Sequence, residues 1–444
     1  MARHYRRLLS HYYSLLIPSS ASVLEVGCGT GHLLERLQVK KKTGIDLSSQ
    51  QIECARQRVP EGYFHVQSGE ELILKETFDY IILSDTVNLA ADVQQLLHRL
   101  KQVAHPKTRI ILNFHNTLWR PLFAFAVRLG LKQAEPENSW LAGSDMKNLL
   151  NLADWEIIQT SSHILCPFPC LGLDILLNRY LAPLLPWFCL TLFYTARPSP
   201  DREPKPLTTS ILIPARNEAG NIESILERIP SFGAETEIIF VEGNSTDRTW
   251  EEIQRVAAAH PEKKIMTLQQ PGKGKGDAVR TGFAVATGDI LMILDADMTM
   301  PPEELTKFYD VIATNSAEFA NGVRLVYPME KEAMRFLNLC ANKAFSLLFT
   351  WLLGQNIKDT LCGTKVMLRG DYEKLVANRN YFGDFDPFGD FDLIFGANKL
   401  NLKFADVPIR YASRTYGATN IARWENGVLL LRMVLFGARK LKFI

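Results

Sequence analysis

Two aspartates, Asp295 and Asp297, follow a continuous apolar run from Ile290 to Leu294. A short apolar run of this kind is typical of a buried strand, which would deliver both carboxylates at its C-terminal end. In an open α/β sheet, ligands bind outside that edge. Carboxylate oxygens suit Mg²⁺ or Mn²⁺, and Mg²⁺ is commonly held together with substrate phosphates. The pair therefore predicts a metal site for a diphosphate and indicates nucleotide-sugar chemistry.

A second candidate ligand site lies near the N-terminus, where Gly27–Gly31 carries glycine at every second position after an apolar run. Glycine lets a backbone approach a ligand that a Cβ would obstruct, and the helix expected from His32 would offer free N–H groups. Dinucleotide folds use a G-x-G-x-x-G frame, so the G-x-G-x-G frame here favours a smaller ligand. Asp46 ends the next apolar run, where a carboxylate can bind ribose hydroxyls.

The elements that must position these residues alternate between apolar runs and helical patterns, which predicts parallel sheets in both halves of the chain. In the first half the expected strands are 22–26, 43–46, 63–66, 80–83, 109–114, 156–161 and 189–195. In the second half they are 210–213, 237–241, 264–268, 290–294, 319–326 and 403–407.

A stretch with four prolines, 198–206, divides the chain. Such a composition forms an extended, semi-rigid spacer. We therefore expect a first domain over 1–197, a linker over 198–206 and a second domain over 207–444 that ends in an amphipathic helix. Both domains would have an ordinary size.

The composition of the 444 residues is that of a globular protein with 47% hydrophobic and 22% charged residues. The net charge of +2 gives no reason to expect a nucleic-acid partner. Seven cysteines without regular spacing argue against a disulfide framework, so we expect reduced thiols and a cytoplasmic protein. A signal peptide is not predicted, because residues 1–16 contain three arginines and no continuous apolar stretch. A transmembrane helix is not predicted either, because the longest apolar segment, 181–196, contains two prolines and is short.

Two segments of the second half combine apolar bulk with basic residues or aromatics, namely 425–444 and 345–353. A single segment of this kind is most simply a helix packed on the core. Two of them favour peripheral contact with a membrane, which for a cytoplasmic protein would be its inner face.

The first half resembles the class I S-adenosylmethionine-dependent methyltransferases over roughly residues 10–197. Three stretches carry the resemblance, in order: 25–31 as the first motif, 44–46 with the ribose-binding acid, and 78–85 as the fourth strand. The resemblance implies a Rossmann-like fold and S-adenosyl-L-methionine as cofactor. The cofactor-binding residues that it implies are Glu25, Gly27, Gly29, Gly31, Asp46, Ser68, Glu70 and Asp85.

The sequence does not identify the methyl acceptor. Asp85, Asn88 and His115 would lie at strand ends facing one cleft, where one of them can orient or deprotonate an acceptor or can simply serve as a cap or loop residue. The proline-interrupted segment 166–186 is either a lid over an apolar acceptor or a packed insertion.

The second half resembles the family 2 glycosyltransferases with the GT-A fold over about residues 207–425. The resemblance implies a nucleotide-sugar donor, a metal at Asp295 and Asp297, and a donor site that also includes Ala296. The other donor-binding residues that it implies are Pro214, Arg216, Glu218, Glu242, Lys365 and Arg414.

Within that family the second half is most similar to dolichyl- and polyprenyl-phosphate sugar synthases. This implies a lipid-phosphate acceptor held by Arg324 and Arg335, although a glycan or other lipid acceptor stays open. An inverting displacement with a metal on the leaving diphosphate is expected. A phosphate acceptor needs only positioning, whereas a hydroxyl acceptor needs a base, for which Asp392 is the candidate unless it is a helix cap.

Two functions are therefore open for this chain. In the first, the chain is bifunctional, with a methyltransferase fused to a glycosyltransferase. In the second, the methyltransferase-like half is a non-catalytic module that binds S-adenosylmethionine or docks a partner.

Overall fold

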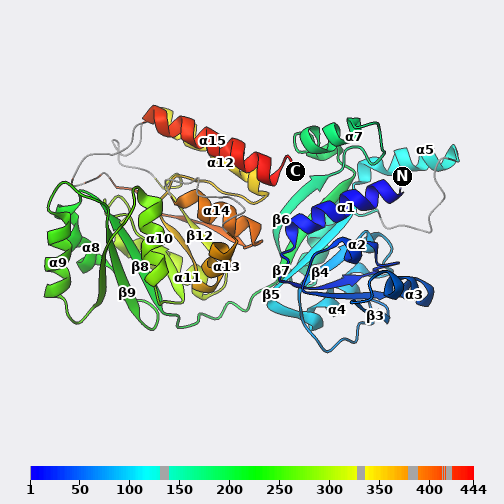
Figure 1. Cartoon of the computed structure of the whole chain (residues 1–444), viewed down its shortest axis with the longest axis horizontal. Helices are drawn as coiled ribbons and strands as arrows, with labels where there is room; N and C mark the ends of the chain where they lie inside the picture. The colour runs from blue at the N-terminus through cyan, green and yellow to red at the C-terminus, as the bar shows by residue number, and fades with distance from the viewer. Residues whose placement is uncertain are drawn as a thin grey trace. The chain divides into compact units, whose positions relative to one another are not determined.

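The computed structural model describes residues 2–130, 140–327, 336–378, 389–412, 414, 416 and 423–444. The chain divides into two compact units (Figure 1). Unit 1 consists of Met1–Pro200 with Lys442–Ile444, and unit 2 consists of Asp201–Leu441. Each unit contains one seven-stranded sheet.

The strands of unit 1 are β1 (Ser22–Val26), β2 (Lys41–Asp46), β3 (Tyr63–Val66), β4 (Phe78–Ser84), β5 (Ala104–His115), β6 (Trp155–His163) and β7 (Thr191–Pro198). Its helices are α1 (Ala2–Leu16), α2 (His32–Arg36), α3 (Ser49–Arg58), α4 (Val93–Leu100), α5 (Arg120–Arg128), α6 (Gly143–Leu152) and α7 (Leu173–Leu176).

The sheet of unit 1 has the order β3-β2-β1-β4-β5-β7-β6. Strands β1 to β5 are parallel, while β7 runs antiparallel to both β5 and β6. The expectation of a parallel sheet is therefore wrong for β7, which lies between β5 and β6 and runs opposite to both. The carboxyl ends of β1 to β6 consequently share one edge.

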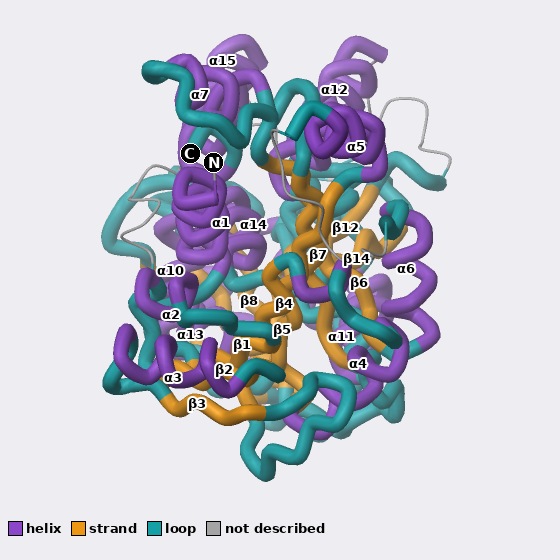
Figure 2. Tube along the Cα trace, turned by 90° about the vertical axis from the view of Figure 1, so that its right-hand side faces the viewer, coloured by secondary structure: helices purple, strands orange, loops and turns teal. Residues whose placement is uncertain are grey.

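The core of unit 1 lies on both faces of the sheet because neighbouring strand residues point to opposite sides. Val23 packs with Tyr13 of α1 on one face, and Leu24 packs with Leu97 of α4 on the other. Figure 2 shows α1, α2 and α3 on one side of β1, β4 and β5, and α4 and α6 on the other.

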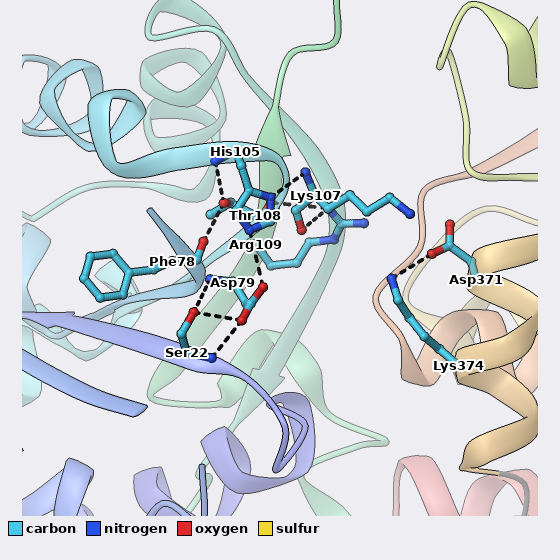
Figure 3. A network of polar contacts seen from close by, with 9 residues as sticks. All are labelled: Ser22, Phe78, Asp79, His105, Lys107, Thr108, Arg109, Asp371 and Lys374. Carbon is cyan, nitrogen blue, oxygen red and sulfur yellow. Dashed lines mark hydrogen bonds and ion pairs between the residues drawn. The ribbon is translucent and has the colours of Figure 1, made fainter. Parts of the chain in front are cut away.

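Polar contacts join the amino ends of three strands in unit 1 (Figure 3). Asp79 accepts hydrogen bonds of 2.8 Å from the backbone and the hydroxyl of Ser22, and its other oxygen lies 3.3 Å from Nε2 of His105. Burial alone would raise the pKa of Asp79, but the hydrogen bonds from Ser22 lower it. These contacts fix the register of β1, β4 and β5 at the edge opposite the glycine turn.

The strands of unit 2 are β8 (Thr209–Ala215), β9 (Thr236–Glu242), β10 (Lys264–Gln269), β11 (Ile290–Ile293), β12 (Phe319–Val323), β13 (Lys365–Leu368) and β14 (Phe404–Pro408). Its helices are α8 (Ile222–Arg228), α9 (Thr249–Ala259), α10 (Lys275–Val285), α11 (Leu305–Ala313), α12 (Phe336–Leu353), α13 (Arg369–Ala377), α14 (Asp390–Lys399) and α15 (Arg423–Leu441).

The sheet of unit 2 has the order β10-β9-β8-β11-β13-β12-β14. Strand β13, which was not predicted, runs antiparallel between β11 and β12, so this sheet is also mixed. Its direction brings the start of β13 to the edge where β8, β9, β11 and β12 end. The predicted strand over 319–326 ends earlier, at Val323.

Both faces of the second sheet are covered as well. Ile211 and Ile213 belong to a core that includes side chains of α8, α9 and α11. Leu212 points to the other face, where its side chain lies against Gly282 of α10. Among the described helices, none is both long and apolar enough to cross a membrane.

Candidate active sites

The glycine turn after β1 requires a backbone that only glycine adopts readily. Gly27, Gly29 and Gly31 have φ values of 72°, 52° and 76°, all in the left-handed region. The turn is held by its own neighbours, since the backbone N–H of Gly27 donates to Ile45 at 2.8 Å. A Cβ on Gly27 would stand 2.8 Å from Oγ1 of Thr86. The turn therefore brings bare backbone to the edge where β2 and β4 also end.

Asp46 lies beside this turn, as expected for a ribose-binding acid. One carboxylate oxygen accepts a hydrogen bond of 2.9 Å from Gly29, and the other accepts one of 2.9 Å from the backbone of Ser48. Each oxygen keeps a second lone pair that can accept from a ligand hydroxyl. The geometry thus brings together the glycines and the acid that the sequence predicted.

Glu25, inside β1, is buried, and its Oε2 has no hydrogen-bond partner in the described part of the chain. Burial raises the pKa of this carboxyl well above its ordinary value, and the nearby Asp46 raises it further. A buried polar atom without a partner is costly. A ligand donor at this position would remove that cost, so the turn and Glu25 together fit a small polar cofactor.

Ser68 and Glu70 also lie at this edge, but their side chains bind the protein. The hydroxyl of Ser68 accepts from the backbone of Glu70 at 3.1 Å. Oε1 of Glu70 accepts from the backbone N–H groups of Ala91 and Asp92, at 2.8 and 3.0 Å. Both residues shape the loops around the predicted cofactor site.

A polar cluster occupies the ends of β4 and β5. The Tyr5 hydroxyl of α1 donates to Oδ1 of Asp85 at 3.1 Å and lies 3.4 Å from Nε2 of His115. The same Asp85 oxygen accepts from Nδ2 of Asn113 at 2.5 Å, and Asp85 has a left-handed backbone with φ 58°. A carboxylate, an imidazole and a phenol in mutual reach can orient or deprotonate an acceptor. Asn88, also predicted here, is buried in the following turn.

Tyr5 is a site residue that the sequence reasoning missed. Helix α1 packs with its tyrosines toward the strand ends, and Tyr13 donates to Oδ1 of Asn113 at 2.7 Å. Burial raises the pKa of Tyr5 well above its usual value, and Asp85 adds to the effect. The available signal was the tyrosines on one face of an amphipathic N-terminal helix.

In unit 2 the predicted donor-binding residues gather at the carboxyl ends of β8, β9 and β11. Pro214 and Ala215 of β8 pair with Val241 and Glu242 of β9. Glu242 is buried and accepts a hydrogen bond from the backbone of Ser245. Arg216, directly after β8, is exposed.

Asp297 and Glu218 share one arginine. Arg414 donates to Oδ2 of Asp297 at 2.9 Å and to Oε1 of Glu218 at 2.7 Å. The other oxygen of Glu218 accepts from Nδ2 of Asn221 at 2.8 Å, and that amide also donates to the carbonyl of Ala296. Burial raises the pKa of Glu218 to about 7, an effect that Arg414 opposes and Asp297 reinforces.

Asp295 is paired with a different cation. Nζ of Lys275, in the first turn of α10, lies 2.6 Å from Oδ1 of Asp295 and 3.7 Å from Oδ1 of Asp390. Burial disfavours the charged lysine, but Asp295 and Asp390 outweigh it and raise the pKa of Lys275. The backbone at Gly363 packs directly against this ion pair, because a Cβ there would stand 1.9 Å from Oδ2 of Asp295.

Lys275 is the second site residue that sequence reasoning missed. It belongs to the glycine-rich stretch Gly272–Gly276, which contains two lysines. Lys273 is exposed, whereas Lys275 reaches Asp295.

Two arginines were predicted to bind the acceptor phosphate, and the structure describes one of them, Arg324. Arg324, directly after β12, makes a two-pronged pair with the buried Asp359 through contacts of 2.7 and 2.9 Å. Burial alone would raise the pKa of Asp359, but Arg324 lowers it. Arg335 lies outside the described residues.

Lys365 and Asp392 also lie within unit 2. Lys365 is buried at the start of β13, and its Nζ donates to the carbonyl of Cys362. Asp392 is buried in the first turn of α14, two residues after Asp390, which approaches Lys275. A role for Asp392 as base stays a prediction.

Asp295 and Asp297 supply only part of the ligand set that a divalent metal needs. Among the described residues, no group of three or more His, Cys, Asp or Glu side chains is placed to hold a metal by itself. Mg²⁺ is usually bound by one or two carboxylates together with substrate phosphates and waters. Asp295 and Asp297 fit that partial donor set.

Two family models match the chain. The model for glycosyl transferase family 2 matches residues 210–376, and a model described as a methyltransferase domain matches residues 17–159. The chain therefore carries a methyltransferase domain followed by a family 2 glycosyltransferase domain. This confirms the recognised families and the predicted α/β fold class with two domains in that order.

Similar proteins cover parts of the chain. Dolichol-phosphate mannosyltransferase of Pyrococcus furiosus is 33% identical over 161 residues, which are 35% of this chain and 45% of that protein. Undecaprenyl-phosphate 4-deoxy-4-formamido-L-arabinose transferase of Pectobacterium carotovorum subsp. carotovorum is 28% identical over 222 residues, 47% of this chain and 61% of that protein. This chain thus spans about half of the length of these relatives.

For the first unit, the similar solved structures include a methyltransferase from Thermotoga maritima, described as SAM-dependent and a possible histamine N-methyltransferase. The match covers 44% of this chain and 90% of that one, with 16% identity and a TM-score of 0.34.

Proposed function

We propose that this chain, which pairs a methyltransferase domain with a family 2 glycosyltransferase domain, moves a sugar from a nucleotide-sugar donor to a polyprenyl-phosphate or related lipid or glycan acceptor. The observation that carries the proposal is the cluster at the end of β11, where Asp295 and Asp297 meet Lys275 and Arg414. The relatives named for dolichol-phosphate and undecaprenyl-phosphate favour a lipid-phosphate acceptor.

The acidic pair would hold Mg²⁺ or Mn²⁺ together with the donor diphosphate. Such an ion neutralises the charge that develops on the leaving diphosphate. Lys275 and Arg414 place two further positive charges at the same edge, which suits a polyanionic donor. With the leaving group neutralised from this side, attack from the opposite face inverts the anomeric centre.

The residues needed at the acceptor end of the site depend on whether the acceptor is a phosphate or a hydroxyl. A phosphate is already nucleophilic and needs only positioning. Arg324 is committed to Asp359 by two hydrogen bonds, so a phosphate there would compete with a buried carboxylate. For a hydroxyl acceptor, Asp392 supplies the base.

The test is a donor screen in Mg²⁺ or Mn²⁺ that records which nucleoside diphosphate is released. Asp297→Asn should reduce turnover at least about 100-fold, because a metal-binding charge and a bond to Arg414 are both weakened. The same variant should keep its affinity for S-adenosylmethionine. Undiminished turnover would contradict the metal assignment.

For unit 1 we propose transfer of a methyl group from S-adenosylmethionine. Gly27–Gly31, Glu25 and Asp46 would hold the cofactor, which supplies an electrophilic methyl group when bound. The cluster of Asp85, Tyr5 and His115 favours catalysis over a purely binding module, since these groups can hold and deprotonate an acceptor. Calorimetry with S-adenosylmethionine followed by methyl transfer to extracted lipids separates the two functions, because a binding module would bind without transfer.

We also propose a cytoplasmic protein with peripheral membrane contact through unit 2. Val428, Leu431 and Leu435 form an exposed apolar stripe on α15, and Leu347 is exposed on α12. A liposome flotation assay tests this contact, and Leu431→Ser with Leu435→Ser should weaken it.

A further inference from the structure

Two segments of unit 1 leave the sheet at its carboxyl edge and form one surface, which we call the apolar collar: residues 116–130 after β5, and residues 164–190 between β6 and β7. Because β5 and β6 both run antiparallel to β7, both segments begin at the edge that carries the glycine turn. Figure 1 shows α5 and α7, one from each segment, at the same end of the unit.

Hydrogen bonds tie the two segments together. Nδ2 of Asn116 donates to the carbonyl of Trp187 at 2.8 Å, and Nε1 of Trp119 donates to the carbonyl of Phe188 at 3.0 Å. The collar is therefore a continuous piece of surface with a defined arrangement.

The collar exposes large apolar side chains in both segments. Helix α5 has no buried residue although it is mostly apolar. Phe125 is 61% exposed and Trp187 is 72% exposed. Other exposed members are Leu122, Leu129, Leu176 and Tyr180. Extended apolar surface of this kind marks a site of interaction, because it is costly to leave in water.

The charges of the collar have one sign. Arg120, Arg128 and Arg179 are exposed. The one acid in the two segments, Asp174, is buried, where it accepts from the backbones of Cys170 and Gly172. Exposed arginines with tryptophan and tyrosine among aliphatic residues match the interface of an anionic bilayer.

The collar adjoins the acceptor end of the site. His115 is the last residue of β5, and the collar starts at the next residue. Phe123 of α5 packs edge-on against the His115 ring with centroids 5.7 Å apart, and Trp140 lies 6.1 Å from the same ring. The collar therefore borders the cluster of Asp85 and His115, whose side chains lie 3.8 Å apart.

We infer that the methyltransferase unit docks on an anionic membrane through the apolar collar and takes an amphipathic lipid with a hydroxyl group as its methyl acceptor. The acceptor class rests on the methyl transfer proposed above, whereas the docking does not. In the reaction, the hydroxyl oxygen bonds to the methyl carbon, the carbon–sulfur bond breaks with its electron pair left on sulfur, and the hydroxyl proton passes to the cluster of Asp85 and His115.

The test is sedimentation of the full chain with vesicles of phosphatidylcholine, with and without one quarter phosphatidylglycerol. The background is Leu431→Ser with Leu435→Ser, which weakens the separate contact expected from α15. On this background, Phe125→Ser with Trp187→Ser should lower the partition coefficient at least about tenfold. Arg120→Gln should lower it about fivefold, and only on anionic vesicles.

The matched control is Ile73→Ser with Leu152→Ser, two exposed apolar residues of unit 1 outside the collar. It should leave vesicle binding unchanged. Equal binding by the collar variant and the control would overturn the docking. So would a collar variant that converts a dimer to a monomer in light scattering while the unaltered collar binds no vesicles, because the occupant would then be a second copy.

Two further measurements separate this inference from the proposed function. Calorimetry with S-adenosylmethionine tests the cofactor site alone, and its failure would leave vesicle binding intact. Transfer of labelled methyl groups to vesicles of total lipid extract should exceed transfer to the same extract after its hydroxyls are acetylated. Equal labelling of both extracts would overturn the acceptor class while leaving the docking in place.

Discussion

At the scale of single residues, the lysine beside Asp295 is the clearest addition to the donor site. Lys275 lies between Asp295 and Asp390 and is partly buried, whereas Lys273 in the same loop is exposed. Lys275→Met should therefore lower the free energy of unfolding by about 2 kcal/mol, because it removes the cation that Asp295 and Asp390 share.

Lys273→Met is the matched control for this variant and should change stability by less than about 0.5 kcal/mol. Urea unfolding measures both. Equal effects of the two substitutions would show that the loop, and not the ion pair between Lys275 and Asp295, is responsible.

Glu218 should make stability depend on pH. Its pKa is about 7 in the folded chain and 4.5 in an exposed glutamate. Between these values the native state keeps a proton that the unfolded state has released, so the free energy of unfolding falls as pH rises through this window. The stabilisation that this proton contributes to the native state is on the order of 3 kcal/mol. This stabilisation is fully present below pH 4.5 and is lost above pH 7.

Glu218→Gln removes this titration. Denaturation midpoints measured from pH 4.5 to 8 should therefore fall less steeply for the variant than for the natural chain. Parallel curves for the two proteins would contradict the raised pKa.

At the scale of elements, the turn between β1 and α2 determines whether unit 1 can bind a cofactor. Gly27→Ala places a Cβ 2.8 Å from Oγ1 of Thr86, whose hydroxyl is fixed by a 2.7 Å bond to the carbonyl of Val26. With the left-handed backbone at φ 72°, the variant should lose about 2–4 kcal/mol of stability and at least about tenfold in S-adenosylmethionine affinity.

Gly130→Ala provides the comparison for this turn. Gly130 also has a left-handed φ, 69°, but a Cβ there would meet no atom within 4 Å. This control should lose about 1 kcal/mol and keep its cofactor affinity. A similar loss in both variants would assign the effect of Gly27→Ala to backbone strain alone.

Sequence reasoning found the elements whose side chains are apolar and regular. The runs before Gly27 and Asp295 could be recognised as strands because most of their residues are apolar and buried. Strand β13 was missed because it begins with Lys365, which leaves an apolar run of only three residues. Its antiparallel direction, which places Gly363 against Asp295, depends on tertiary pairing that local sequence does not encode.

The same distinction holds for the candidate sites. Asp46, Asp295 and Asp297 follow strands, so their shared edges could be predicted. Tyr5 approaches Asp85 from a helix 80 positions away, and only the packing of α1 reveals it.

At the scale of the whole molecule, each of the two units carries its own candidate site. Contacts of Asp46 stay within unit 1 and contacts of Asp297 stay within unit 2 among those described. The chemistry of each site can therefore be changed by itself. We predict that Asp46→Asn weakens S-adenosylmethionine binding at least about tenfold and changes donor turnover less than twofold. Conversely, Asp297→Asn should lower donor turnover at least about 100-fold and change S-adenosylmethionine binding less than twofold.

The two assays also measure energetic coupling between the units. If the sites are independent, saturating S-adenosylmethionine leaves the KM for the nucleotide sugar within twofold, and the double variant shows the sum of the two single effects. A tenfold change in donor affinity on cofactor binding would correspond to a coupling free energy of about 1.4 kcal/mol and would contradict independence. Calorimetry of the donor with and without S-adenosylmethionine decides this, because binding affinities, unlike turnover numbers, must change reciprocally if the sites are linked.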